Sequence, residues 1–117
     1  MTVQIKRVYQ PASPEDGYRV LVDRLWPRGL SKASLKLDEW IKEIAPSSEL
    51  RRRFHHDESH WEEFQRRYFK ELDNRSALVE QLIQRARVGN LTLLYAAKDE
   101  IHNNAMALRN YLERKSV

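Results

Sequence analysis

The sequence predicts a small α/β domain with a short, mostly parallel sheet flanked by helices, and three observations lead to this prediction. Two segments near the start, residues 3–9 and 18–23, have the composition of strands. Amphipathic segments with helical spacing fill most of residues 37–88. Residues 91–97 are then almost continuously apolar, which is typical of a strand covered on both faces in a parallel sheet.

A loop separates the two opening strands. Residues 3–9 alternate between the two faces of an extended chain, which suits a half-buried strand. Pro11 and Gly17 predict a loop, and residues 18–23 are rich in β-branched and aromatic side chains. The second strand is therefore expected to deliver Asp23 to a turn.

Two helices are predicted after this turn. Apolar residues at positions i, i+3, i+4 and i+7 over residues 37–44 predict a helix that Pro46 ends. Ser47 is expected to cap the next helix, which carries Leu50 and Phe54 on one face.

Two longer helices follow. Ser59 and Glu62 form an S-x-x-E capping box, from which a helix is expected to reach about residue 73. Apolar residues recur with helical spacing over residues 76–88, and Gly89 stands just past the end of that segment.

The composition limits the class of protein. The chain has 117 residues, of which 41% are hydrophobic, and its formal net charge is +4. This length predicts a single domain over residues 1–117, and the apolar content excludes a disordered chain. No cysteine is present, which excludes disulfides and thiol chemistry and suits a reducing compartment. Without an apolar run typical of a signal peptide or a membrane span, we expect a cytoplasmic protein with no membrane partner.

The predicted topology brings two distant segments together. The helices before residue 91 are long enough to cross over between parallel strands, whose carboxyl ends then share one edge of the sheet. Asp23–Arg24 and Lys98–Asp99 are expected to emerge side by side at that edge, where open α/β sheets bind ligands. A last helix is predicted over residues 103–114.

The segment that follows the second strand suits an anionic ligand. Arg24 and Arg28 are two permanently charged forks within one turn, and Gly29 permits a tight backbone. Trp26 offers a flat wall for a base or a sugar. The alternative is that Asp23 pairs with an arginine and Trp26 fills the core. Neither a Walker loop nor a G-x-G-x-x-G fingerprint is present.

A histidine cluster is the second candidate for chemistry. His56 beside Asp57 suits a general base oriented by a carboxylate, and a capping or hydrogen-bonding role is the alternative. A metal site that includes His55, His56 and His60 is a further interpretation. On an unbroken helix, His56 and His60 would share one face. The predicted cap at Ser59 separates these histidines, so no metal is expected.

Polar residues after the last strand form the other half of the expected site. Lys98 and Asp99 precede Asn103 and Asn104 at the start of a helix, whose N-terminus carries a partial positive charge. Either asparagine also suits the N-cap position, and the two roles are compatible.

Basic residues on the central helices raise the question of nucleic-acid binding. Arg51–Arg53, Arg66 and Arg67 lie near aromatic residues. Acidic residues interrupt this charge, and the aromatic residues lie on the predicted inward stripe, which favours a solvated helical face.

Four blocks of sequence between residues 22 and 105 carry a resemblance. They are Val22–Gly29, Ala45–Ser47 with Glu49–Arg51, Phe54 with His56–Asp57, and Leu94–Asp99 with Asn104–Ala105. They resemble domain-of-unknown-function family 488 (DUF488), in its short YeaO-like bacterial branch. The resemblance implies a Rossmann-like three-layer α/β fold and no established activity. Arg53 departs from it, because the family has an aromatic residue there.

These observations favour a cationic pocket at the carboxyl edge of the sheet that binds a phosphorylated or nucleotide-like small molecule. Hydrolysis or group transfer on that molecule is one alternative, and binding alone is another. The catalytic candidates are Asp23, His56 and Asp57. The candidates for ligand binding are Arg24, Trp26, Arg28, Arg51, Lys98, Asp99, Asn103 and Asn104. A nucleic-acid-binding regulator or sensor that uses the same arginines, and a non-catalytic interaction module, are the other functions considered; no cofactor is expected.

Overall fold

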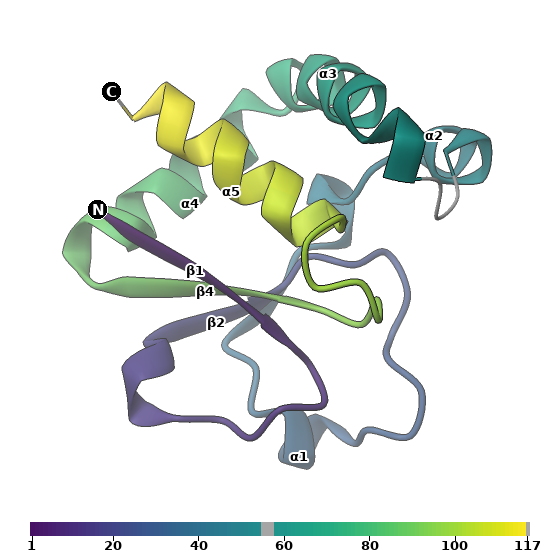
Figure 1. Cartoon of the computed structure of the whole chain (residues 1–117). Coiled ribbons are helices and arrows are strands. Elements are labelled where there is room, and N and C mark those ends of the chain that lie inside the picture. Colours follow the sequence, from purple (N-terminus) through teal and green to yellow (C-terminus); the bar gives the residue numbers. More distant parts are fainter. Residues whose placement is uncertain (55–57, 117) are drawn as a thin grey trace.

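The computed structural model describes residues 1–54 and 58–116, and within them four strands form one parallel sheet in the order β1-β4-β2-β3 (Figure 1). The strands are β1 (Thr2–Arg7), β2 (Tyr18–Leu21), β3 (Glu39–Trp40) and β4 (Asn90–Tyr95). Because β4 lies between β1 and β2, Leu93 is in register with Ile5 on one side and with Val20 on the other. The predicted α/β class with a short parallel sheet is confirmed.

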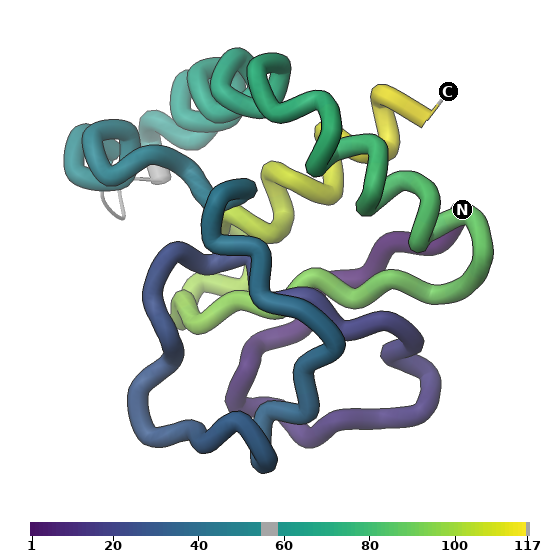
Figure 2. Tube along the Cα trace, turned by 180° about the vertical axis from the view of Figure 1, so that it is seen from behind, coloured from purple at the N-terminus to yellow at the C-terminus, as the bar shows by residue number. Residues whose placement is uncertain are grey.

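Helices cover one face of this sheet, and a short helix with long loops covers the other (Figures 1 and 2). The helices are α1 (Lys32–Leu35), α2 (Ser48–Arg53), α3 (Trp61–Asp73), α4 (Ser76–Val88) and α5 (Asn104–Lys115), and short 3-10 turns span Pro14–Asp16, Lys42–Ile44 and Glu58–His60. α4 and α5 pack on β1 and β4, whereas α3 packs on α4 and α5. None of the helices in the described residues combines the length and the apolar character needed to cross a membrane.

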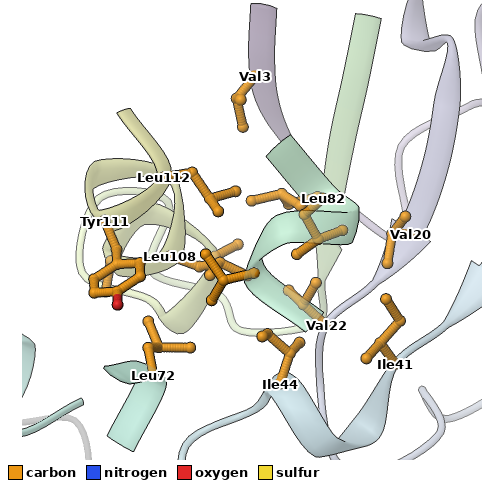
Figure 3. Packing of buried hydrophobic residues seen from close by; sticks show 14 of the residues in the cluster. Val3, Val20, Val22, Ile41, Ile44, Leu72, Leu82, Leu108, Tyr111 and Leu112 are labelled. Carbon is orange, nitrogen blue, oxygen red and sulfur yellow. The ribbon is translucent and has the colours of Figure 1, made fainter. Parts of the chain in front are cut away.

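The larger hydrophobic core lies between the sheet and its helices (Figure 3). Val20 of β2, Leu93 of β4, Leu82 of α4 and Leu108 of α5 are each at most 1% exposed there. Truncating such a leucine to alanine typically costs about 2–5 kcal/mol. A smaller cluster around Leu94 packs against α1 and its loops on the opposite face. β4 is therefore buried on both faces, as its apolar sequence predicts.

The prediction of a helix over residues 37–44 is wrong. The segment instead forms β3, which pairs with β2 at the edge of the sheet, and a 3-10 turn. The N–H groups of Asp38 and Ile41 donate to backbone carbonyls of β2 at 2.9 and 3.0 Å. Ile41 and Ile44 are buried in this conformation too, so the same apolar side chains fill the core without a helix.

The predicted capping box at Ser59 and Glu62 is also wrong. A 3-10 turn occupies residues 58–60, and α3 begins at Trp61 with His60 in the N-cap position and no side-chain cap. Because the turn already includes Ser59, its hydroxyl is one residue too early to cap the helix, and it lies 3.4 Å from Nδ1 of His60.

The remaining helix predictions are confirmed. Ser47 caps α2 by accepting a hydrogen bond from the Leu50 N–H at 3.1 Å. The helix predicted over residues 76–88 has those bounds, and the one predicted over 103–114 is α5, shifted by one residue. Asn103 is its N-cap and accepts from the Met106 N–H at 2.8 Å.

Candidate functional site

A cavity opens at the edge of the sheet where β2 and β4 end. The two strands are parallel neighbours, and the Ala96 N–H after β4 donates to the Asp23 carboxylate after β2 at 2.9 Å. The expected meeting of these two segments is therefore confirmed. They border a cavity of about 450 Å³ together with residues of α2, α3 and the start of α5. The predicted site residues that line it are Asp23, Arg24, Trp26, Arg28, Arg51, Asp99, Asn103 and Asn104.

Asp23 joins three elements at the base of the cavity. Its Oδ2 accepts the Ala96 N–H at 2.9 Å, and its Oδ1 accepts from Nδ2 of Asn104 in α5 at 3.0 Å. The same Asn104 amide donates to the Val22 carbonyl at 3.0 Å. Burial raises the pKa of Asp23, although the hydrogen bonds from Ala96 and Asn104 and the charge of Arg51 oppose this shift. Both carboxylate oxygens are thus engaged by the fold itself.

Arg24 lines the cavity with hydrogen-bonding capacity that the fold leaves unused. Its Nη2 lies 3.3 Å from the Ala45 carbonyl and 3.5 Å from that of Pro46, both of which are long contacts. Its Nε is buried and has no acceptor among the described residues. An unsatisfied buried donor typically costs about 1–3 kcal/mol, so an acceptor in the cavity would stabilise this side chain.

Two further guanidinium groups line the same cavity. Arg28 comes from the turn after β2, and Arg51 comes from α2; both residues are exposed. In the described part of the chain, neither they nor Arg24 has a carboxylate oxygen within 4.0 Å. Three arginines therefore converge on one cavity without an ion-pair partner in those residues.

The turn that carries Arg24 and Arg28 is held in place by aromatic side chains. The Trp26 indole donates to the Leu30 carbonyl at 2.7 Å, and its ring meets Trp40 edge-on with centroids 5.4 Å apart. The backbone is held further by the Tyr9 hydroxyl, which donates to the Arg28 carbonyl at 3.1 Å. Trp26 thus packs against the smaller core and lines the cavity as well.

Asp99 and Asn103 shape the loop on the other side of the cavity. Oδ1 of Asp99 accepts the N–H groups of Ile101 and His102, each at 2.9 Å. The N–H of His102 contributes most to lowering the pKa of Asp99 to about 2, followed by that of Ile101. Nδ2 of Asn103 donates to the Asp99 carbonyl at 3.0 Å. Both residues line the cavity mainly as parts of a fixed turn before α5.

An aromatic wall faces this turn, and the sequence did not identify it as part of a site. Trp61 stacks on Phe64 with centroids 5.8 Å apart, and both line the cavity beside Phe54. The His102 ring meets Trp61 edge-on at 5.3 Å, and Nδ1 of His102 lies 3.1 Å from Oδ2 of Asp99. The only sequence signal is the aromatic spacing along residues 54–64, which predicts a buried stripe rather than a site.

One predicted site residue, Lys98, does not join the lining, and two others are not described by the structure. Lys98 is exposed and lies outside the residues that border the cavity. His56 and Asp57 lie outside the described residues. In the ranges 1–54 and 58–116, no group of three or more histidine, aspartate or glutamate side chains is placed to hold a metal ion.

The lining of the cavity therefore combines two kinds of chemical group. It contains the guanidinium groups of Arg24, Arg28 and Arg51 and the rings of Trp61 and Phe64. One guanidinium group can donate two parallel hydrogen bonds to two oxygens of a phosphate or a carboxylate, and aromatic rings bind planar apolar groups. Asn103 and Asn104 at the start of α5 also line the cavity, so the positive end of the α5 helix dipole lies at the same place.

Comparison with known proteins gives a match over nearly the whole chain. The family described as "Inactive DUF488-N3 subclade" matches residues 2–116. The chain is 48% identical to "Uncharacterized protein YeaO" of Escherichia coli (strain K12) over 112 residues, which make up 96% of this chain and 97% of that protein.

A mycobacterial relative matches a shorter part. The chain is 46% identical to "Uncharacterized protein Rv3073c" of Mycobacterium tuberculosis (strain ATCC 25618 / H37Rv) over 78 residues, which are 67% of this chain and 66% of that protein. No solved structure matches the chain.

Proposed function

The chain belongs to the DUF488 family, in the subclade described as inactive, and on this premise we propose that its cavity binds a small phosphorylated ligand of the nucleotide class without converting it. The observation that carries the proposal is the set of three arginines, Arg24, Arg28 and Arg51, which line one cavity and have no carboxylate partner in the described part of the chain.

The phosphate is assigned to the three arginines of the cavity. Arg24 has an unsatisfied buried Nε, and the exposed guanidinium groups of Arg28 and Arg51 are free to turn toward an anion. Charge-assisted bonds of this kind are shorter and stronger than neutral ones, and a planar fork matches two phosphate oxygens at once. The N-terminus of α5, beside Asn104, adds a favourable partial charge.

A planar ring of the ligand is assigned to the aromatic residues of the lining. Trp61 and Phe64 stack with an interplanar angle of 17°, so they present nearly parallel faces. Ligand cavities in proteins typically measure about 300–1,000 Å³, and this one, at about 450 Å³, lies toward the lower end of that range. A mononucleotide suits it better than a dinucleotide.

Binding without turnover is supported by the way the acidic group is used. Asp23, the catalytic candidate that lines the cavity, has both oxygens engaged by Ala96 and Asn104. The family description, with its word "inactive", points the same way. We therefore propose a sensor or carrier role in the cytoplasm, with no cofactor.

A ligand screen tests this proposal. Nucleoside monophosphates, sugar phosphates, inorganic phosphate and unphosphorylated nucleosides are added separately, and the melting temperature is measured. At a concentration of about 100 times Kd, a ligand adds about 2.7 kcal/mol of stability, or a rise of roughly 10 °C for a domain of this size. We expect nucleoside monophosphates to give the largest shift.

The matched control is on the same helix. Arg51→Gln is expected to reduce the shift, whereas Arg52→Gln should not, because Arg52 is exposed and does not line the cavity. Ligand recovered unchanged after long incubation supports binding alone. Release of phosphate or nucleoside would refute the absence of turnover, and a lack of response to every anion would refute the proposed ligand class.

A further inference from the structure

We propose that a second groove, between α2 and α3, binds the backbone phosphates of a single-stranded nucleic acid. The groove has a volume of about 460 Å³ and shares no lining residue with the first cavity. Figure 2 shows α2 beside α3, with α2 at the end of the molecule away from the chain termini. The groove is thus a separate site from the one that Asp23 organises.

Its cations come from both helices. Arg53 of α2 and Arg66, Arg67 and Lys70 of α3 line the groove. Arg67 is paired with Glu63 at 3.0 Å. Within the described residues, no carboxylate lies within 4.0 Å of the other three cations, so their charge is available to a bound anion.

The carboxylates that border the groove do not balance this charge. Glu71 accepts the backbone N–H of Ser47 at 2.9 Å and its hydroxyl at 2.6 Å, and Arg75 lies 3.9 Å away. The charge of Glu71 is therefore used to fix the start of α2 on α3. Glu49 is the other carboxylate among the lining residues of the described chain, and the same lining contains four cations.

The groove and the first cavity meet across α2. Arg51 lines the cavity, whereas Arg53, two residues later, lines the groove. The ring of Phe54 lines the cavity, and the guanidinium groups of Arg53 and Arg67 lie 5.8 and 5.6 Å from its centroid. A chain whose terminal nucleotide enters the cavity therefore passes over α2 and reaches the groove with its next phosphates.

This continuity selects the partner. The choice of nucleic acid over an acidic peptide rests on the proposed nucleotide site, because only a nucleic acid presents both a planar base and a run of phosphates. A single strand is flexible enough to bend over α2 and to place an unstacked base on an aromatic wall. Reading the sequence of a duplex instead needs a protein element that enters the major groove of the duplex. α2 has only 6 residues, which is short for that role.

Fluorescence anisotropy with a labelled single strand tests this inference. The probe is a DNA or RNA oligonucleotide of about ten nucleotides, a length within the site sizes of single-strand binding folds. With three available cations each neutralising one phosphate, the groove should contribute about −2 to the slope of the logarithm of the binding constant against the logarithm of salt concentration, and the arginines of the cavity should make the total slope steeper.

Two double variants make the result specific. Arg66→Gln combined with Lys70→Gln should make the slope less steep by about 1.4 and weaken binding at least tenfold at about 50 mM salt. Arg87→Gln combined with Lys32→Gln removes the same charges from exposed positions on α4 and α1 and should leave both quantities unchanged.

The outcomes separate this inference from the proposed function. Unchanged binding of a nucleoside monophosphate to the Arg66/Lys70 variant, with weakened oligonucleotide binding, supports the groove. Equal loss in both double variants, displacement of the oligonucleotide by polyglutamate at matched charge, or tighter binding of duplex DNA overturns it. Should the wild-type protein bind the oligonucleotide in the expected way but no mononucleotide, the proposed function fails while the groove stands.

Discussion

Replacing Arg24 by methionine should separate ligand binding from folding stability. Methionine keeps the apolar stem of the side chain and removes the guanidinium. The substitution removes the hydrogen bonds from Nη2 to the carbonyls of Ala45 and Pro46, which measure 3.3 and 3.5 Å. Bonds of that length contribute at most about 1 kcal/mol, whereas removal of the unsatisfied Nε relieves about 1–3 kcal/mol.

These two effects together predict that removing the Arg24 guanidinium does not destabilise the fold but weakens ligand binding. In the absence of ligand, the free energy of unfolding should stay the same or rise by up to about 2 kcal/mol. Affinity for a nucleoside monophosphate should fall roughly 10- to 150-fold, which corresponds to the loss of about 1.5–3 kcal/mol of charge-assisted hydrogen bonding.

Urea denaturation measures the first quantity, and isothermal titration calorimetry measures the second. Arg87→Met, at an exposed position on α4, is the control and should change neither. If Arg24→Met loses more than about 2 kcal/mol of stability and binds ligand like the wild-type protein, then Arg24 is a structural residue and the reasoning fails.

Further predictions concern the aromatic wall, the buried acid and two turns. Trp61→Ala should weaken binding of a nucleoside monophosphate about 5- to 150-fold, because stacking on a base is typically worth about 1–3 kcal/mol, and leave binding of inorganic phosphate unchanged in calorimetry; equal loss for both would contradict the assignment of the ring. Because the pKa of Asp23 is raised in the folded state, its protonation favours folding at low pH, so the stability of the wild-type protein relative to Asp23→Asn should decline as pH rises through that pKa, and a constant difference in urea midpoints would contradict this. Gly17→Ala should lower the free energy of unfolding by about 2 kcal/mol or more, and the melting temperature with it, because Gly17 has φ of +64° and an added Cβ would lie 2.2 Å from the Asn90 carbonyl oxygen. If the variant melted like the wild-type protein, the turn would relax at little cost, which contradicts this prediction. The pKa of Asp99 is lowered from 3.8 to about 2, so the stabilisation lost in Asp99→Ala should be complete above pH 4 and fade as pH falls toward 2, and a melting-temperature difference that persists at pH 2 would refute that link.

The edge of the sheet was predictable because it depends on patterns that are local in the sequence. The apolar run over residues 91–97 indicates a strand buried on both faces, and the long helical stretch before it implies a parallel crossover. These two facts are enough to bring Asp23 and Asp99 to one edge. Asn103 as N-cap was also predictable, since capping depends on the few residues that follow it.

Other parts depend on contacts between distant residues. β3 is a strand of two residues, and its conformation is set by pairing with β2 rather than by its own apolar spacing, which favours a helix. The aromatic wall of Trp61 and Phe64 belongs to the site only because α3 packs where it reaches over the sheet edge. Spacing along a helix shows which side chains share a face, but not which neighbour that face meets.

His102 was not predictable for a related reason. In the sequence it lies three residues after Asp99, in a stretch that indicates only the approach to a helix. In the structure the Asp99 turn directs the ring of His102 against Trp61 at the cavity. The position of that ring depends on side-chain hydrogen bonds within the loop, which a pattern of residue types does not specify.

A crystal structure of the protein with a bound nucleoside monophosphate tests the central claim most directly. We expect the phosphate oxygens to lie within hydrogen-bond distance of the Arg24 guanidinium and of Arg28 or Arg51, and the base to lie against Trp61. A nucleotide bound elsewhere, or a phosphate that contacts none of the three arginines, would contradict it.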